Sequence, residues 1–286
     1  FGFQRVGDLA WAAGDMRARG FLVGGTAGRT TLNGEGLQHE DGNSHMISSM
    51  IPNCISYDPT FAYELAVIVQ DGMRRMFQEG EDVFYYITVE NENYTHPEMP
   101  EDAEEGIRKG LYLLKQGNDN SRKVQLMGSG AILREAIAAA NILEQDFGVS
   151  ADIWSATSFS ELRRDGVDCA RWNRLNPEQE ARIPWVTECL RDRQGPVIAA
   201  SDYVRSFADQ IRGFLAQEDY IVLGTDGFGR SDTREQLRRF FEVDRYNIAY
   251  AALYALYRRD VISMGELTEA RSSLGIDPAK PNPVDV

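Results

Sequence analysis

The chain has 286 residues, of which 43% are hydrophobic and 26% are charged, and this composition is typical of a globular protein with one or two domains. Its formal net charge of −14 argues against a broad nucleic-acid surface, because such a surface needs clustered Lys and Arg side chains. Its apolar runs are far shorter than the ~20 residues of a membrane helix, and its three scattered cysteines have neither metal-ligand nor disulfide spacing, as expected of reduced thiols in a cytoplasmic protein.

The first ninety residues alternate between helix and strand patterns. Apolar residues recur at helical spacing over residues 6–19, and Gly20 follows as a stop signal. Three strands are predicted, at residues 21–24, 52–56 and 83–89, and the last of them is rich in aromatic and β-branched residues. Asp58 and Pro59 are typical of a helix start, and helical spacing follows them. This alternation predicts βα units and a mostly parallel sheet.

A stretch rich in prolines and acidic residues separates this part from a second alternation. Residues 90–105 contain Pro97 and Pro100 and show little periodicity, so we interpret them as an interdomain linker. Further strands are predicted at residues 124–127, 151–156, 196–200 and 220–223. Helices are predicted at residues 131–147, 204–214, 246–258 and 265–274, and one more begins at a capping box near Asp232. The second part is therefore also an α/β domain.

The loop at residues 34–45 is the most unusual segment. It gathers two of the three histidines, three carboxylates and three glycines, and without an apolar run it is expected to lie outside the core. His39 precedes Glu40 and Asp41, and a neighbouring carboxylate can adjust a histidine for proton transfer near neutral pH. The pattern leaves two other interpretations open: a solvated loop histidine, or a metal site formed by His39, Asp41 and His45, whose spacing matches no known signature.

Two glycine-containing turns lie between a strand and a helix, where backbone N–H groups can hold a phosphate. The turn at residues 128–130 lacks the third glycine and the acidic residue of the dinucleotide fingerprint, so a tight turn is the favoured interpretation. The turn at residues 224–230 is similarly placed, and we favour a packing loop between the domains.

Five long motifs together resemble one enzyme family. They are Phe-Gly-Phe-Gln-Arg-Val-Gly-Asp at residues 1–8, Gly-Thr-Ala-Gly-Arg-Thr-Thr-Leu-Asn at 25–33, the loop at 34–45, Ile-Pro-Asn-Cys-Ile-Ser-Tyr-Asp-Pro at 51–59 and Gly-Thr-Asp-Gly-Phe-Gly-Arg-Ser-Asp at 224–232. With them the chain resembles, over essentially its whole length, the homodimeric bacterial pyruvate dehydrogenases, the thiamine-diphosphate-dependent decarboxylating components of the pyruvate dehydrogenase complex.

The resemblance implies an α/β fold with two transketolase-like domains and mostly parallel sheets. Residues 1–97 would be the later part of the pyrimidine-binding domain, residues 98–110 a linker, and residues 111–286 the C-terminal domain. The opening of the chain within a structured region suggests a fragment. The family's magnesium motif and its cofactor-activating glutamate are expected in a segment before Phe1, so the chain alone is expected to be inactive.

The resemblance also implies roles for four residues. Phe1 is similar to the aromatic side chain that packs on the aminopyrimidine ring of the cofactor. Arg5, Glu35 and His39 are similar to polar residues that line the reaction centre. His39 would donate to the pyruvate oxygen on which negative charge develops, or bind the substrate carboxylate, and Glu35 would orient His39 or Arg5. The family is expected to have a histidine where Asn43 stands, so Asn43 has no inferred role.

The implied reaction is the decarboxylation of pyruvate, with transfer of the acetyl group to lipoyl-lysine of the dihydrolipoyl acetyltransferase component. The implied cofactors are thiamine diphosphate and magnesium, with no metal ligand from this chain, and the implied enzyme is a cytoplasmic homodimer that binds neither nucleic acid nor membrane. Two alternatives share the fold: a non-catalytic dimerisation module and a transketolase-type sugar-transferring enzyme.

Overall fold

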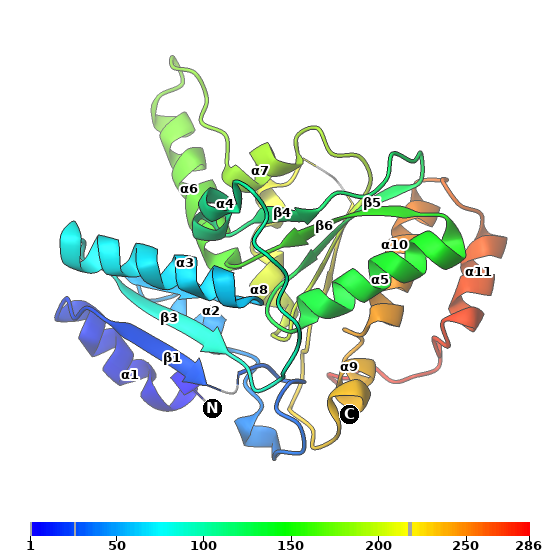
Figure 1. Cartoon of the computed structure of the whole chain (residues 1–286), viewed down its shortest axis with the longest axis horizontal. Helices are drawn as coiled ribbons and strands as arrows, with labels where there is room; N and C mark the ends of the chain where they lie inside the picture. Colours follow the sequence, from blue (N-terminus) through cyan, green and yellow to red (C-terminus); the bar gives the residue numbers. More distant parts are fainter. Residues whose placement is uncertain (1, 26, 217–218) are drawn as a thin grey trace.

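The computed structural model describes residues 2–25, 27–216 and 219–286, whose strands form two sheets (Figure 1). We call the part built on the first sheet, up to residue 97, the N-terminal half, and the part built on the second sheet, from residue 111, the C-terminal half. The sheets are joined by a stretch that contains one short helix, α4 (Ala103–Lys109).

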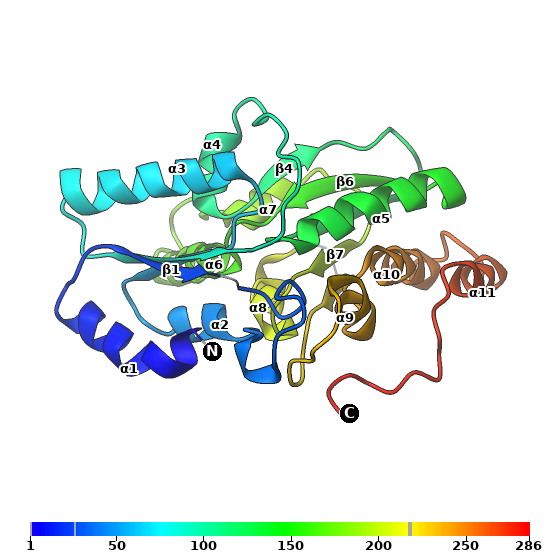
Figure 2. The same ribbon diagram turned by 60° about the horizontal axis from the view of Figure 1, so that its bottom comes forward.

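The N-terminal half contains a three-stranded parallel sheet in the order β1-β3-β2. Its strands are β1 (Phe21–Gly25), β2 (Cys54–Tyr57) and β3 (Phe84–Val89). Helices α1 (Gly2–Asp15) and α2 (Ser44–Ser48) pack on one face of the sheet. Helix α3 (Ala62–Met73), which continues as a π-helical turn (Arg74–Gln78), packs on the other face (Figure 2).

The C-terminal half contains a five-stranded sheet in the order β4-β6-β5-β7-β8. Its strands are β4 (Tyr112–Lys115), β5 (Lys123–Gly128), β6 (Ser150–Ser155), β7 (Val197–Ala200) and β8 (Tyr220–Leu223). Only the edge strand β4 runs antiparallel to its neighbour. Strands β5 and β7 are buried on both faces, as a parallel sheet covered by helices requires.

Helices cover both faces of this sheet. One face carries α5 (Ile132–Phe147), α9 (Arg234–Phe240), α10 (Arg245–Arg258) and α11 (Met264–Ser273). The other face carries α6 (Phe159–Leu175), α7 (Trp185–Leu190) and α8 (Arg205–Asp209), with a short 3-10 turn at Arg212–Phe214. No helix in the described part of the chain is both long and apolar enough to cross a bilayer.

A buried acid connects the two halves. Glu64 of α3 accepts hydrogen bonds from the Tyr112 hydroxyl (2.7 Å) and the Ser155 hydroxyl (2.6 Å), which both belong to the second sheet. Its other oxygen accepts the N–H groups of Thr60 (2.5 Å) and Phe61 (2.9 Å) at the start of α3. One oxygen of this carboxyl thus joins α3 to β4 and β6, and the other bonds the start of α3 itself.

The α/β class with mostly parallel sheets is confirmed, and every strand predicted from the sequence is present. The helix predicted to start at Asp58 instead begins at Ala62. Asp58 is buried, its N–H donates to the carbonyl oxygen of Thr157 (2.8 Å), and its carboxylate accepts the Thr88 hydroxyl (2.6 Å). Asp58 is therefore bonded to distant parts of the chain instead of capping α3. The predicted linker at residues 98–110 contains α4, so it is not irregular throughout.

Candidate functional site

A cavity of about 620 Å³ lies between α1, the carboxyl end of β1 and the loop at residues 34–45. Its polar lining consists of Arg5, Glu35, His39, Asp41 and Asn91, and its apolar lining includes Val6, Val23, Ala27, Leu32 and Tyr86. The carboxyl ends of strands are where open α/β sheets bind their ligands. The structure thus brings together Arg5, Glu35 and His39, whereas Phe1 lies outside the described residues.

Glu35 and His39 form a pair within the loop. His39 ends a single 3-10 turn, η1 (Leu37–His39), and its Nδ1 lies 3.1 Å from Oε2 of Glu35. The His39 side chain is 41% exposed and the Glu35 side chain is 50% exposed, so both can contact a ligand in the cavity. A carboxylate that accepts the Nδ1 proton fixes the tautomer, and Nε2 then becomes the nitrogen that exchanges a proton with a substrate.

Arg5 reaches the same loop from α1. Its Nη2 lies 3.5 Å from Oε1 of Gln38, next to His39 in the chain. A guanidinium group with planar donors suits a carboxylate ligand. The cavity therefore combines a guanidinium group from α1 with a histidine–carboxylate pair from the loop.

The rest of the loop is packed rather than solvated, which corrects the expectation that it lies outside the core. Glu40 and Asp41 are buried. Glu40 accepts the N–H of Arg230 (2.5 Å), and burial raises the pKa of Glu40 to about 7. Asp41 accepts the N–H groups of Asn43 and Ser44 (3.0 Å each) at the start of α2. The carboxylate bonded to His39 is therefore Glu35, not one of its immediate neighbours.

His45 lies in the core and not beside His39. Its Nδ1 is 2.5 Å from the Ser56 hydroxyl, its Nε2 is 3.1 Å from the Thr88 hydroxyl, and its ring stacks on Phe207 with centroids 4.8 Å apart. Complete burial lowers the pKa of His45 to about 4, so the ring is neutral at neutral pH. Among residues 2–25, 27–216 and 219–286, no group of three or more His, Cys, Asp or Glu side chains is arranged to hold a metal ion. The metal alternative for His39, Asp41 and His45 is therefore wrong.

The turn at residues 128–130 faces the chain's own carboxyl groups. Carboxyl oxygens of Asp58 and Glu90 lie 2.7 Å from the position that a Cβ on Gly130 would occupy. Burial raises the pKa of Asp58 to about 7 and holds the pKa of Glu90 well above its usual range, and Asp202 adds repulsion to both. The turn is thus filled by acids of this chain, which fits the tight-turn interpretation.

The turn at residues 224–230 packs against the loop at residues 34–45, as expected for a packing loop. The guanidinium of Arg29 donates to the carbonyl oxygen of Gly227, and the N–H of Arg230 donates to Glu40 (2.5 Å). The C-terminal half thereby supports the outer side of the loop that lines the cavity.

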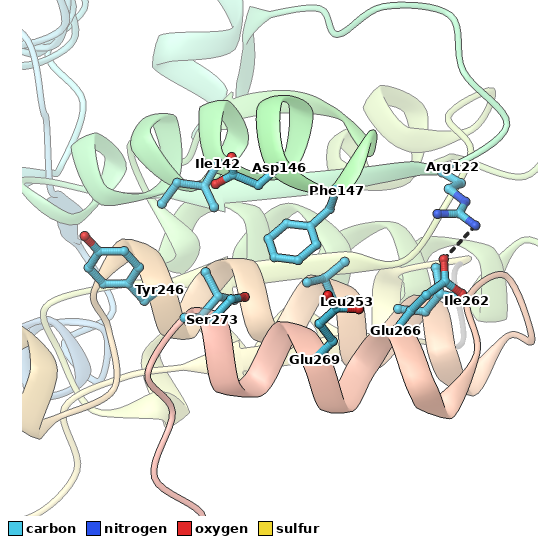
Figure 3. Close-up of a pocket in the computed structure, with 11 residues that line it drawn as sticks. Arg122, Ile142, Asp146, Phe147, Tyr246, Leu253, Ile262, Glu266, Glu269 and Ser273 are labelled. Atoms are coloured by element: carbon cyan, nitrogen blue, oxygen red, sulfur yellow. Dashed lines mark ion pairs between the residues drawn. The ribbon is translucent and has the colours of Figure 1, made fainter.

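A second cavity, of about 450 Å³, lies between α5, α10 and α11 (Figure 3). Ile142, Phe147 and Leu253 point into it, and an ion pair between Arg122 and Glu266 (2.9 Å) borders one end. None of the residues singled out in the sequence lines it. We place the candidate site at the first cavity, where three of them meet.

Two family models match the chain. The model described as "Pyruvate dehydrogenase E1 component middle domain" matches residues 1–97, and the model described as "Transketolase-like TK C-terminal domain" matches residues 110–244. The pyruvate dehydrogenase E1 component of Pseudomonas aeruginosa is 60% identical over 286 residues, and its Escherichia coli K12 counterpart is 57% identical over 284 residues. The chain belongs to the pyruvate dehydrogenase E1 family. These matches cover 100% and 99% of the chain, which spans 32% of each relative's length.

Solved transketolases share the fold of this pyruvate dehydrogenase E1 family member. The transketolase of Campylobacter jejuni gives a TM-score of 0.64 at 17% identity and covers 88% of the chain with 34% of its own. The transketolase of Leishmania mexicana gives a TM-score of 0.61 at 14% identity and covers 88% of the chain with 33% of its own. At this identity the likeness concerns the fold alone.

Among the polar side chains of the cavity lining, sequence reasoning did not assign Asp41, Tyr86 and Asn91 to it. Asn91 follows the carboxyl end of β3, the middle strand, and its place directly after a strand was the available signal. Tyr86 belongs to the buried strand pattern and gave no separate signal. Asn43 packs at the start of α2, where its N–H bonds Asp41.

The pyruvate dehydrogenase E1 family implies thiamine diphosphate, and the described residues suit only part of this group. Apolar side chains beside Arg5 and His39 suit a ring and a small oxo acid. The diphosphate needs a metal anchor, and no carboxylate cluster of that kind occurs in the described ranges. The lining of the cavity thus suits the ring and substrate side of such a site.

Proposed function

We propose that this chain is part of a thiamine-diphosphate-dependent pyruvate dehydrogenase that decarboxylates pyruvate and passes the acetyl group to lipoyl-lysine of a dihydrolipoyl acetyltransferase. The observation that carries the proposal is the Glu35–His39 pair, which lines one cavity together with Arg5 in a chain 60% identical to a pyruvate dehydrogenase E1 component. Magnesium would be held by residues of the longer protein.

Three further features belong to the same proposal. We infer that residues 1–97 are the later part of the pyrimidine-binding domain, residues 98–110 the connection and residues 111–286 the C-terminal domain, in line with the separate sheets and the two family models. The enzyme would be a homodimer. It would work in the cytoplasm, in line with three free cysteines.

In this mechanism Arg5 binds the carboxylate of pyruvate through its guanidinium group. Bound thiamine diphosphate supplies the nucleophilic carbon and accepts the electron pair that carbon dioxide leaves behind. His39 donates a proton or a hydrogen bond from Nε2 to the ketone oxygen as negative charge develops there. Val6, Val23 and Leu32 line the cavity beside these groups and give it an apolar side.

Glu35 supports His39 rather than the substrate. Its carboxylate, 3.1 Å from Nδ1, accepts the Nδ1 proton and orients the doubly protonated ring, so that donation from Nε2 leaves the neutral ring still bonded to Glu35. Since both side chains are about half exposed, the electrostatic part of this support is screened by water, and orientation is its main effect.

The test is carbon dioxide release from pyruvate by the full-length protein. His39→Ala is expected to lower the rate by about 100-fold or more, as the loss of a proton-transfer or oxyanion group does. His96→Ala is the matched control, because the His96 ring lies outside the cavity and accepts the N–H of Ala62 (3.0 Å). Near-normal turnover by His39→Ala would overturn the role of His39. Turnover of ketose phosphates with pyruvate inert would favour the transketolase-type alternative.

A further inference from the structure

Two buried threonines shortly precede the loop at residues 34–45, and one acid of the C-terminal half bonds both of them. Thr30 and Thr31 are fully buried. Oδ1 of Asp202 accepts the N–H (2.9 Å) and the hydroxyl (2.7 Å) of Thr30. Oδ2 of Asp202 accepts the hydroxyl of Thr31 (2.7 Å). A single carboxylate, just past the end of β7, thus binds both residues of the dipeptide.

A guanidinium group lies on the other side of the same hydroxyls. Arg238 of α9 donates from Nε to the Thr30 hydroxyl (3.4 Å) and from Nη2 to the Thr31 hydroxyl (3.4 Å). Its position is set by ion pairs with Glu92 (2.5 Å) and Glu135 (3.6 Å). Each threonine hydroxyl therefore donates to a carboxylate and accepts from a guanidinium, which gives it a defined orientation.

The backbone around the dipeptide is shaped for this contact. Gly28 has a φ of +88°, and a Cβ at this position would overlap the Asp202 carboxylate, so only glycine allows the approach. The N–H of Arg29 donates to the carbonyl oxygen of Asp202 (3.1 Å). The carbonyl oxygen of Thr31 accepts from Nε of Arg234 (2.8 Å).

The fixed segment lies between residues that line the candidate site. Ala27 precedes it, and Leu32, Glu35 and His39 follow it, all on the cavity. Past the threonines, the N–H of Gly34 donates to the carbonyl oxygen of Asp232 (3.0 Å). The loop between Gly34 and His39 is largely exposed, so its starting direction is set by the contacts before it.

We propose that Asp202 and Arg238 are positioning residues: together they clamp Thr30 and Thr31 and thereby set where the C-terminal half holds the Glu35–His39 wall of the cavity. The clamp itself rests on the contacts above, and its consequence for turnover rests on the proposed function. The C-terminal half then acts on the reaction through this contact, without touching the substrate.

The test uses the Thr30→Val/Thr31→Val double variant of the full-length protein, which keeps the branched shape of both side chains and removes both hydroxyls. Thr187→Val is the matched control, because the Thr187 hydroxyl donates to the carbonyl oxygen of Phe214 (2.5 Å) on the opposite face of the sheet. Amide hydrogen exchange of residues 32–41 is expected to accelerate about tenfold or more in the double variant and to stay unchanged in the control. Unchanged exchange in the double variant would overturn the clamp.

Turnover and rescue separate positioning from stability. The double valine variant is expected to lose kcat for pyruvate by about tenfold, because a displaced acid–base pair slows the chemical step. Thr30→Ser/Thr31→Ser keeps both hydroxyls and should restore both exchange and kcat. Faster exchange with an unchanged kcat would overturn the positioning role.

If the wild-type protein shows no pyruvate turnover, the proposed function fails while the exchange result still decides the clamp. Should the double variant not fold, Thr31→Val alone is expected to give the same changes at smaller size, and wild-type values would overturn the proposal.

Discussion

At the scale of single residues, the partner of His39 is Glu35, four positions earlier, rather than the acids that follow it directly. The 3-10 turn that ends at His39 brings Nδ1 within 3.1 Å of Glu35, whereas Glu40 and Asp41 turn inward to bond backbone N–H groups. His39 is thus bonded to an exposed acid, and the buried acids give the loop its shape.

Replacement of Glu35 tests this division of roles. Glu35→Gln keeps an oxygen that can accept the Nδ1 proton but removes the charge, so kcat for pyruvate is expected to fall by about 3- to 10-fold, less than the loss for His39→Ala. Glu98→Gln is the control, because Glu98 is exposed and does not line the cavity. A steady-state kinetic comparison of the two variants checks the prediction, and a loss as large as that of His39→Ala would contradict a supporting role.

Part of this site was predictable from the sequence. The composition of the loop at residues 34–45 indicated chemistry, and the resemblance singled out Arg5, Glu35 and His39 although Arg5 and His39 are far apart in the chain. The burial of His45 was not predictable, because it depends on Ser56 and Thr88 in two strands and on Phe207 from the other half of the chain. Local pattern contains no information about such distant partners.

At the scale of secondary structure elements, the turn between β5 and α5 is where the C-terminal half meets two buried acids of the N-terminal half. Carboxyl oxygens of Asp58 and Glu90 face Gly130. Asp58 accepts the hydroxyls of Thr88 and Tyr203 and lies near His45. The charge of Asp202 raises the pKa of Glu90, and the charge of Arg238 lowers it. Burial with neighbouring negative charge explains why the pKa of both carboxyls is raised.

Asp58 makes stability depend on pH. A carboxyl whose pKa is higher in the folded protein binds its proton more tightly there, so its contribution is present below about pH 4 and is lost as the pH rises through about 7. In Asp58→Asn the neutral amide resembles the protonated acid. The stability of this variant relative to wild type is therefore expected to increase between pH 4 and pH 8.

Urea unfolding of both proteins across this range checks the prediction, and a relative stability that does not change with pH would contradict it. His45 works in the opposite sense, since its pKa is lowered from 6.5 to about 4 and its contribution is lost as the pH falls. Because His45 Nε2 lies 3.9 Å from Oδ1 of Asp58, the comparison reports on both groups together.

Gly130 gives a second test of the same turn. Its φ is +50°, and an added Cβ would lie 2.7 Å from carboxyl oxygens of Asp58 and Glu90. Gly130→Ala is expected to lower the free energy of unfolding by about 1–3 kcal/mol. Gly265→Ala in α11 is the control, because its nearest atom would be 3.7 Å away and its helical position favours alanine. Equal stability of the two variants in urea unfolding would contradict the account of this turn.

The strands were more predictable than the helices. β3 has a dense β-branched and aromatic run, whereas the helical spacing of Phe159, Leu162, Gly166 and Cys169 in α6 includes only two large apolar side chains. β4 pairs as an antiparallel edge strand, and a short run such as Tyr112–Lys115 has no local feature that specifies its neighbour.

At the scale of the whole molecule, the two sheets are connected by polar contacts that no sequence pattern announced. The alternation of elements predicted the fold class, while the bonds from Glu64 to Tyr112 and Ser155 depend on the packing of α3 against the second sheet. Through Asp202 and Arg238 the C-terminal half also reaches the cavity wall. The site is thus a product of both halves, although its lining residues come from the first.

The division of the proposed site between this chain and the rest of the longer protein predicts how the 286-residue chain binds thiamine diphosphate. The described ranges contain no carboxylate cluster for a diphosphate-bound metal, and the chain spans 32% of the length of its relatives. Calorimetry is therefore expected to show binding of thiamine diphosphate with magnesium weaker than about 1 μM, or none, while the full-length protein binds tightly. Submicromolar binding by the chain alone would contradict this distribution of the site.

The most direct test of the central claim is the crystal structure of the full-length protein with thiamine diphosphate, magnesium and pyruvate or a slow-reacting 2-oxo acid. The account predicts density for the oxo acid in the 620 Å³ cavity, with its carboxylate on Arg5 and an oxygen about 3 Å from Nε2 of His39. Density only in the cavity between α5, α10 and α11, or an oxo acid out of reach of His39, would contradict it.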